Sequence, residues 1–135
     1  MSGAMGPELC FVAWSILLGF VYIGLPIVIA TRVNGMAWNA GPRDEAAKPM
    51  PAIGQRLDRA RANFLETYPM FLAAVLIAVG RQHTNQWTTW GAETYIWARL
   101  VYIPLYAFGI SYVRSLAWVL SVAGIGLILY GAVHT

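Results

Sequence analysis

The sequence contains two long runs without any charged side chain, residues 9–30 and 116–133, and two further apolar runs that carry one or two charges, residues 64–80 and 92–110. An α-helix needs roughly 20 mostly apolar residues to cross the hydrocarbon core of a bilayer. Only 11% of the side chains are charged, less than half of the roughly 25% found in soluble domains. The sequence therefore predicts an all-α integral membrane protein, a four-transmembrane-helix bundle in one domain over residues 1–135.

The predicted helices are joined by a long connection at about residues 31–59, which is rich in Gly and Pro, and by two short connections. Four antiparallel helices place the first and third connections on the same side of the membrane. Seven of the nine Lys and Arg residues lie near these two connections, and Arg81 alone lies on the other side. Because cytoplasmic segments carry an excess of Lys and Arg, we expect both termini on the non-cytoplasmic side.

Several classes of function are disfavoured by the composition. The net charge of +3 is too small, and too dispersed, to predict nucleic-acid binding. The lone cysteine, Cys10, excludes an internal disulfide or a cysteine metal cluster. His83 and His134 are too few and too far apart to predict a metal site. The sequence also lacks the internal repeat that is typical of small transporters.

The second predicted helix begins with an unusual row of polar residues. Arg56, Arg59, Asn63 and Glu66 are spaced by three, four and three residues, which places them within an arc of about 80° on one helix face. Guanidinium groups bind carboxylates in a bidentate manner, and a carboxylate binds an ammonium group. The row therefore suits a zwitterionic, peptide-like ligand. The alternative is a basic helix start that binds lipid head groups, with Glu66 held in a salt bridge.

The third helix has a matching face, formed by Tyr95, Arg99, Tyr102 and Tyr106 at spacings of four, three and four residues. Arg99 lies well inside the apolar run and needs a partner there, because a charge inside the membrane is costly. Glu66 is the carboxylate at comparable depth, so we expect an ion pair between Arg99 and Glu66. The tyrosines are equally consistent with simple aromatic packing.

Arg114 and Ser115 stand at the start of the fourth helix, on the predicted cytoplasmic side. An Arg at this position commonly acts as a positive-inside anchor. The functional alternative is a cation that lies over a ligand thiol, because a nearby cation lowers the pKa of a thiol from about 8.5. Arg suits this role since it stays charged at any working pH.

Three motifs carry a resemblance to a known family. Arg59-Ala60-x-x-Asn63-x-x-Glu66-x-x-Pro69-x-Phe71 resembles the signature of the MAPEG family, the membrane-associated proteins in eicosanoid and glutathione metabolism. Ala98-Arg99-x-x-Tyr102-x-x-x-Tyr106 is similar to the third-helix pattern of that family, and Arg114-Ser115 is similar to the start of its fourth helix. Ala62 and Thr67 depart from the branches that act on eicosanoids, so the resemblance is to a generic, bacterial-type member.

The resemblance implies a homotrimer with glutathione bound as a co-substrate between adjacent subunits, in the bacterial inner membrane. It implies a transferase or peroxidase that activates the glutathione thiolate for attack on a lipophilic small molecule, without a metal. It also implies roles for nine residues: Arg114 and Ser115 in catalysis, and, in glutathione binding, Arg32, Arg59, Asn63, Glu66, Arg99, Tyr102 and Tyr106. The alternative is a non-catalytic relative that binds membrane lipids or serves as an accessory membrane subunit.

Overall fold

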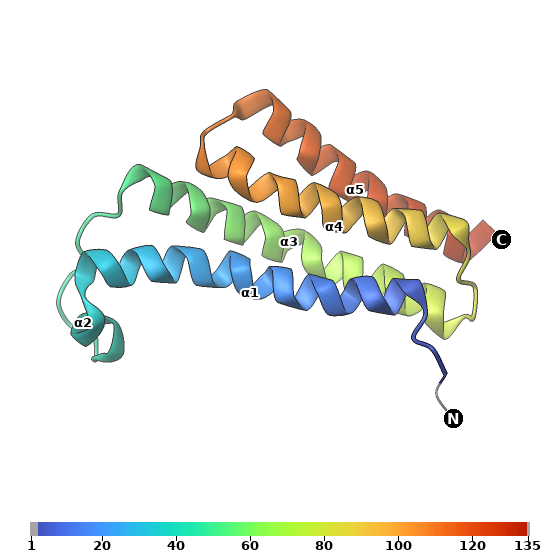
Figure 1. Ribbon diagram of the computed structural model, residues 1–135, viewed down its shortest axis with the longest axis horizontal. Helices are drawn as coiled ribbons and strands as arrows, with labels where there is room; N and C mark the ends of the chain where they lie inside the picture. Colours follow the sequence, from blue (N-terminus) through green and yellow to red (C-terminus); the bar gives the residue numbers. More distant parts are fainter. Residues whose placement is uncertain (1–2, 135) are drawn as a thin grey trace.

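The computed structural model describes residues 3–134, which form four long helices and one short one. Each long helix runs antiparallel to the next, so that both termini lie at one end of the bundle (Figure 1). The short helix α2, together with the long first connection and the turn between the last two helices, lies at the opposite end. In chain order the helices are α1 (Pro7–Asn34), α2 (Met36–Ala40), α3 (Ala52–Gly80), α4 (Gln86–Ala107) and α5 (Ser111–His134).

The predicted all-α architecture is confirmed for the described residues, whereas the number of membrane spans is only partly supported. Helices α1, α3 and α5 are long and apolar enough to cross a membrane, and α4 does not join them by these criteria. The apolar character of α4 is diluted by Glu93 and Arg99, by several threonines, and by Trp and Tyr side chains, which carry polar atoms. The fourth span therefore stays a prediction.

The helix ends explain why the first connection is shorter than the predicted segment 31–59. Helix α1 continues to Asn34 and ends at Gly35, whose φ of +88° is a conformation that glycine adopts without steric cost. Helix α3 begins at Ala52, directly after Pro51. Its charged first turns extend the helix beyond the apolar run, so the polar row predicted from the sequence lies on continuous helix.

A ladder of stacked aromatic rings ties α1, α3 and α4 together. The ring centroids are 4.4 Å apart for Tyr22 and Phe64, 4.8 Å for Phe64 and Tyr68, 6.3 Å for Tyr68 and Phe71, and 4.2 Å for Phe71 and Tyr95. Offset-stacked rings contribute more than their buried area alone. This ladder fixes the register of α3 against its two neighbours.

Helices α4 and α5 pack closely because glycines face each other at their crossing. A Cβ atom built on Gly91 would lie 2.5 Å from the carbonyl oxygen of Gly124, and one built on Gly124 would lie 2.6 Å from the carbonyl oxygen of Gly91. Small residues let helix backbones approach in this way. The contact holds α4 and α5 close together, and this pair carries five of the predicted site residues, Arg99, Tyr102, Tyr106, Arg114 and Ser115.

A buried carboxylate joins α1 to α4 near the chain termini. Glu8 is 1% exposed, and its Oε1 accepts hydrogen bonds from the hydroxyls of Thr88 at 2.6 Å and Thr89 at 2.8 Å. The sequence did not predict this contact. Glu8 directly precedes the uncharged run 9–30, so it was expected to lie outside the membrane segment. It anchors the start of α1 to the capped start of α4.

Candidate functional site

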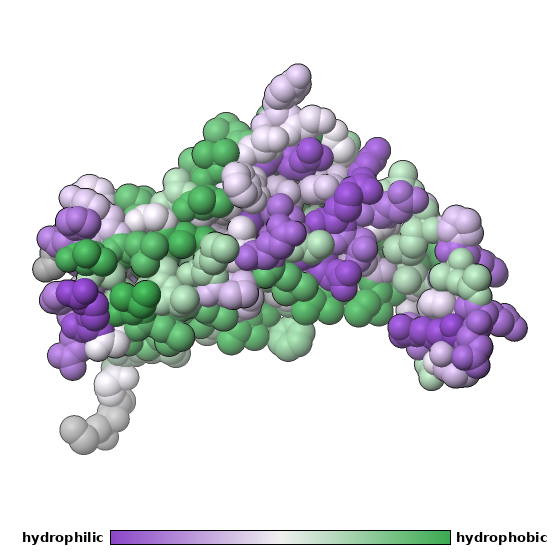
Figure 2. Space-filling view, turned by 180° about the vertical axis from the view of Figure 1, so that it is seen from behind, coloured by the Kyte–Doolittle hydropathy of each residue, from purple (hydrophilic) through white to green (hydrophobic). Residues whose placement is uncertain are grey.

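A broad hydrophilic area interrupts the apolar surface on the face of the bundle opposite to the one in Figure 1 (Figure 2). Polar residues of α3 reach the surface well inside the helix, since both Arg59 and Glu66 are exposed and Glu66 lies at the midpoint of α3. Charged side chains at such depth are costly in lipid and usually serve a function. The candidate site lies beside this face of α3.

One cavity of about 460 Å³ gathers most of the predicted site residues. It lies where α3, α4 and α5 meet, and α5 contributes to it with the residues around Arg114. Five of its seven lining residues are predicted site residues, drawn from three helices that are far apart in the sequence. The lining residues are Asn63, Tyr102, Tyr106, Arg114, Ser115, Trp118 and Val119.

Two cations converge on the ring of Tyr106. The Cζ atom of Arg114 lies 4.6 Å from the centroid of this ring, and the Cζ atom of Arg59 lies 6.0 Å from it. Arg59 Nε also donates a hydrogen bond to the Tyr106 hydroxyl at 3.3 Å. Cation–π contacts of this kind are attractive and hold the guanidinium in place. Two guanidinium groups therefore lie beside Tyr106, and that of Arg114 lines the cavity.

Arg99 lies beneath the cavity and is completely buried. Its Nη1 donates to Asn63 Oδ1 and its Nη2 donates to Thr67 Oγ1, both at 2.7 Å. Its Cζ atom also lies 5.1 Å from the centroid of the Tyr102 ring. Two acceptors and a flanking aromatic face thus compensate in part for the burial of the cation.

The predicted ion pair between Arg99 and Glu66 is wrong. In the part of the chain that the structure describes, one ion pair is found, and it joins Arg61 to Asp58 on the surface of α3. The reason is helical register: the face of α3 turned toward α4 presents Asn63 and, one turn later, Thr67, whereas Glu66 points outward. Neutral oxygens therefore take the place of the expected carboxylate.

The remaining predicted residues are not all brought to the cavity. Glu66 is exposed on α3 and is absent from the cavity lining. The Ser115 hydroxyl lines the cavity and donates to the carbonyl oxygen of Ser111 at 3.2 Å. Arg32 is exposed in the last turn of α1 and is absent from the cavity lining.

Arg56 contacts the end of α4, just before the turn that leads into α5 and Arg114. Its Nη1 donates to the carbonyl oxygen of Ala107 at 3.3 Å, at the C-terminal end of α4, where a cation also interacts favourably with the helix dipole. Gly109, with a φ of +72°, follows this end, and a Cβ atom there would lie 3.2 Å from Arg56 Cζ. The sequence placed Arg56 on the polar face of α3 but gave no hint of this contact.

Trp118 and Val119 are lining residues that the sequence analysis missed. They follow Arg114 and Ser115 by four residues each, and residues four apart lie on the same helix face. This spacing is the feature of the sequence that could have predicted them.

Among residues 3–134, no group of three or more His, Cys, Asp or Glu side chains is placed to hold a metal ion.

The comparison with family models identifies the class of protein. The model of the MAPEG family matches residues 11–134, which is nearly the whole chain, so this protein belongs to the MAPEG family. The family is membrane-bound and includes glutathione transferases, peroxidases and eicosanoid enzymes as well as non-catalytic members. Searches of curated proteins and of solved structures each returned no significant match. The predicted family is therefore confirmed, and the three apolar helices agree with a membrane protein.

Proposed function

We propose that this protein is a glutathione-dependent membrane transferase or peroxidase that activates the glutathione thiolate for attack on lipophilic electrophiles. The observation that carries the proposal is the convergence of Asn63, Tyr102, Tyr106, Arg114 and Ser115 in one cavity. These residues come from three helices, and neither packing nor membrane insertion requires polar groups to meet there. The volume of about 460 Å³ lies within the range of about 300–1,000 Å³ that is common for small-molecule sites.

The charges around the cavity complement those of glutathione, which carries two carboxylates, one ammonium group and a thiol. The guanidinium of Arg59, at the rim beside Tyr106, is suited to a carboxylate. The exposed carboxylate of Glu66 is suited to the ammonium group. The proposal assigns these two residues to the two ends of the peptide.

The contact with Arg99 determines how Asn63 would serve the ligand. Because Asn63 Oδ1 already accepts from Arg99 at 2.7 Å, the amide nitrogen of Asn63 remains as the group that donates to a ligand carbonyl or carboxylate. Arg99 therefore acts as a positioning residue below the site. In this role it fixes the orientation of an amide that would otherwise rotate freely.

Arg114 is the residue that we assign to thiol activation. It lies over Tyr106 and forms no ion pair with any residue among those described, so its charge is available to a ligand. A thiol has a pKa of about 8.5, and a cation beside the sulfur lowers this value. The thiol proton passes to solvent, the thiolate forms a bond to an electrophilic carbon or a peroxide oxygen, and the leaving group departs with the displaced electron pair.

Ser115 is assigned a supporting role in the same step. Its hydroxyl lines the cavity one residue after Arg114 and now donates to the Ser111 carbonyl oxygen. Rotation about χ1 would direct this donor at the thiolate. A hydrogen bond to the charged form of the thiol favours that form.

The proposal includes a homotrimer in which an adjacent subunit completes the site. Support comes from Glu66 and Arg59, which are exposed on α3 of a single subunit, although charged groups at the depth of Glu66 are costly in lipid. Coverage of this face by another subunit would remove the cost. Arg32, at the end of α1, would then reach the glutathione of the neighbouring subunit.

We place the protein in a bacterial inner membrane, with both termini outside the cytoplasm. The first connection and the turn between α4 and α5 share one end of the bundle (Figure 1), and most of the Lys and Arg residues lie toward that end. The cavity, which includes Arg114 and Ser115 near this turn, would open to the cytoplasmic supply of glutathione.

Turnover of glutathione with a chlorodinitrobenzene tests the proposal. Purified protein should catalyse the conjugation, and Arg114→Ala should lower kcat by about a hundredfold, as expected for loss of one group that stabilises the developing charge. Arg81→Ala is the matched control and should keep full activity. It removes an exposed Arg at the C-terminal end of α3, at the end of the bundle away from Arg114. Absence of turnover in the unaltered protein would contradict the enzymatic proposal.

A further inference from the structure

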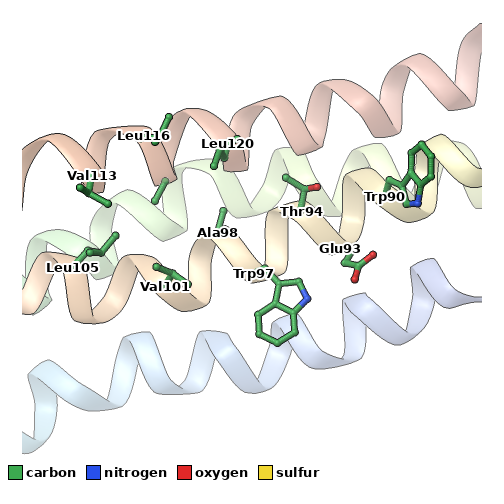
Figure 3. A pocket seen from close by; sticks show the side chains of 11 residues that line it. Trp90, Glu93, Thr94, Trp97, Ala98, Val101, Leu105, Val113, Leu116 and Leu120 are labelled. Atoms are coloured by element: carbon green, nitrogen blue, oxygen red, sulfur yellow. The ribbon is translucent and has the colours of Figure 1, made fainter.

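A second cavity of about 500 Å³ lies on the outer surface of the α4–α5 pair (Figure 3). It shares no lining residue with the candidate site, because neighbouring residues of α5 face in different directions: Val113 and Leu116 line this groove, and Arg114 and Ser115 line the site. The lining extends along α4 from Trp90 to Leu105 and along α5 from Val113 to Leu120.

The groove has one charged group, at one end. The Glu93 carboxylate is exposed, and within residues 3–134 no hydrogen bond or ion pair joins it to another group. Trp90 and Trp97 lie one turn before and one turn after Glu93 on α4, and their side chains are 46% and 58% exposed. A carboxylate between two accessible indole rings is suited to an ammonium group, because indoles are the best aromatic partners for cations.

The rest of the groove is apolar and long. From Trp90 to Leu105 it follows sixteen residues of α4, which span about 22 Å from first to last at a rise of 1.5 Å per residue. Beyond Thr94 the lining consists of aliphatic and aromatic side chains of α4 and α5. The groove therefore has the shape and polarity of an elongated amphiphile with its charge at one end.

We propose that this groove is a binding site for a lipophilic amine, in which the ammonium group meets Glu93 and the apolar part lies along α4 and α5. The lining contains no Lys or Arg, so nothing in it would bind the phosphate of a phospholipid. An ammonium group attached directly to the apolar part fits this arrangement, whereas a phospholipid would place its phosphate beside Glu93.

A second copy of the chain is a poorer occupant for the same reason of charge. Glu93 lies in the first half of α4, toward the end of the bundle that holds the termini. At that end Arg81 is the one Lys or Arg residue among those described. A neighbouring subunit of the same orientation would therefore bring few cations to Glu93.

Electron spin resonance with chain-labelled probes tests the proposal directly. The full-length protein in phosphatidylcholine nanodiscs receives a spin-labelled hexadecylamine, the alcohol of the same chain length, or a spin-labelled phosphatidylethanolamine. The motionally restricted fraction of each probe gives its relative association with the protein. We expect the amine to associate about five- to tenfold more strongly than the alcohol, the size expected for a cation–π contact supported by a charge pair.

Glu93→Gln should lower this ratio to the smaller preference that the two indole rings alone confer, whereas Glu45→Gln should leave it unchanged. The control removes the same charge from an exposed position in the connection between α2 and α3. Because Glu93 is also exposed, its conversion to Gln leaves the packing intact, which unchanged helicity would verify. The proposal is overturned by equal binding of amine and alcohol, by an undiminished ratio in Glu93→Gln, or by phosphatidylethanolamine binding as strongly as the amine. None of these results bears on glutathione turnover, which is measured separately.

Discussion

The guanidinium of Arg99 donates to the side-chain oxygen of Asn63 over 2.7 Å, and so joins a completely buried cation to the wall of the candidate site. The same guanidinium is held from the other side by Thr67. The packing of α3 against α4 and the orientation of a cavity-lining amide therefore depend on one buried group. Arg99 therefore supports the site from the interior, whereas Asn63 lines the cavity itself.

Thr67→Val should destabilise the protein, because it removes one of the two side-chain acceptors of Arg99 while keeping the shape of the side chain. A hydrogen bond to a charged group contributes about 1.5–3 kcal/mol, and the free energy of unfolding in detergent should fall by about 2 kcal/mol. Thr84→Val, at an exposed position between α3 and α4, is the control. Equal stability of the two variants would show that Thr67 is dispensable to Arg99.

Gly91→Ala should disrupt the crossing of α4 and α5, since its Cβ atom would lie 2.5 Å from the carbonyl oxygen of Gly124. Overpacking of this kind costs about 1–3 kcal/mol, which thermal unfolding would detect as a lower Tm. Gly126→Ala, on the same α5 helix but with no atom within 4 Å of the new Cβ, should be neutral or stabilise by up to about 1 kcal/mol. A reversed order of the two Tm values would contradict this packing.

Glu8→Ala should lower stability without lowering turnover. It leaves the hydroxyls of Thr88 and Thr89 without their carboxylate acceptor, at a cost of about 2–3 kcal/mol. Chemical unfolding measures the loss, with Glu45→Ala as a control that should change stability by no more than about 0.5 kcal/mol. A Glu8→Ala protein of normal stability but reduced turnover would instead assign Glu8 to the reaction.

Tyr106→Leu should lower kcat/KM more than Tyr106→Phe does. Phe keeps the ring beneath the Arg114 and Arg59 guanidiniums and loses only the hydroxyl that accepts from Arg59. Leu removes both, which costs a further 0.5–2 kcal/mol, or about two- to thirtyfold in rate. Identical rates for the two variants would mean that the ring does not position the cations.

The sequence predicts the candidate site better than it predicts the interior that supports it. Spacing along single helices predicts that Asn63 and Arg59 share a face, and that Tyr102 and Tyr106 do, because helical periodicity is fixed by geometry. The resemblance to the family then implies that these faces belong to one site. Periodicity does not predict which side chains of two helices meet, so the partner of Arg99 was predicted as Glu66 and found to be Asn63 and Thr67.

The same limit explains the other differences. Glu8 is buried because α4 brings two threonine hydroxyls to it, and this contact joins residues 80 positions apart. The early start of α3 at Ala52 differs from the predicted span because hydropathy marks the membrane segment and not the end of the helix. Arg56 contacts the end of α4 across 51 positions of the sequence, which periodicity along α3 alone does not predict.

We propose that Arg114 stabilises the thiolate of bound glutathione, and a difference ultraviolet titration of that thiolate measures this effect. In the unaltered protein the pKa of the bound thiol should lie at least one unit below its value of about 8.5 in solution, a tenfold shift toward thiolate. Arg114→Ala should bind glutathione but return the pKa of its thiol to the solution value, and Arg81→Ala should match the unaltered protein. An equal thiolate fraction in the unaltered protein and in Arg114→Ala would show that Arg114 does not stabilise the thiolate.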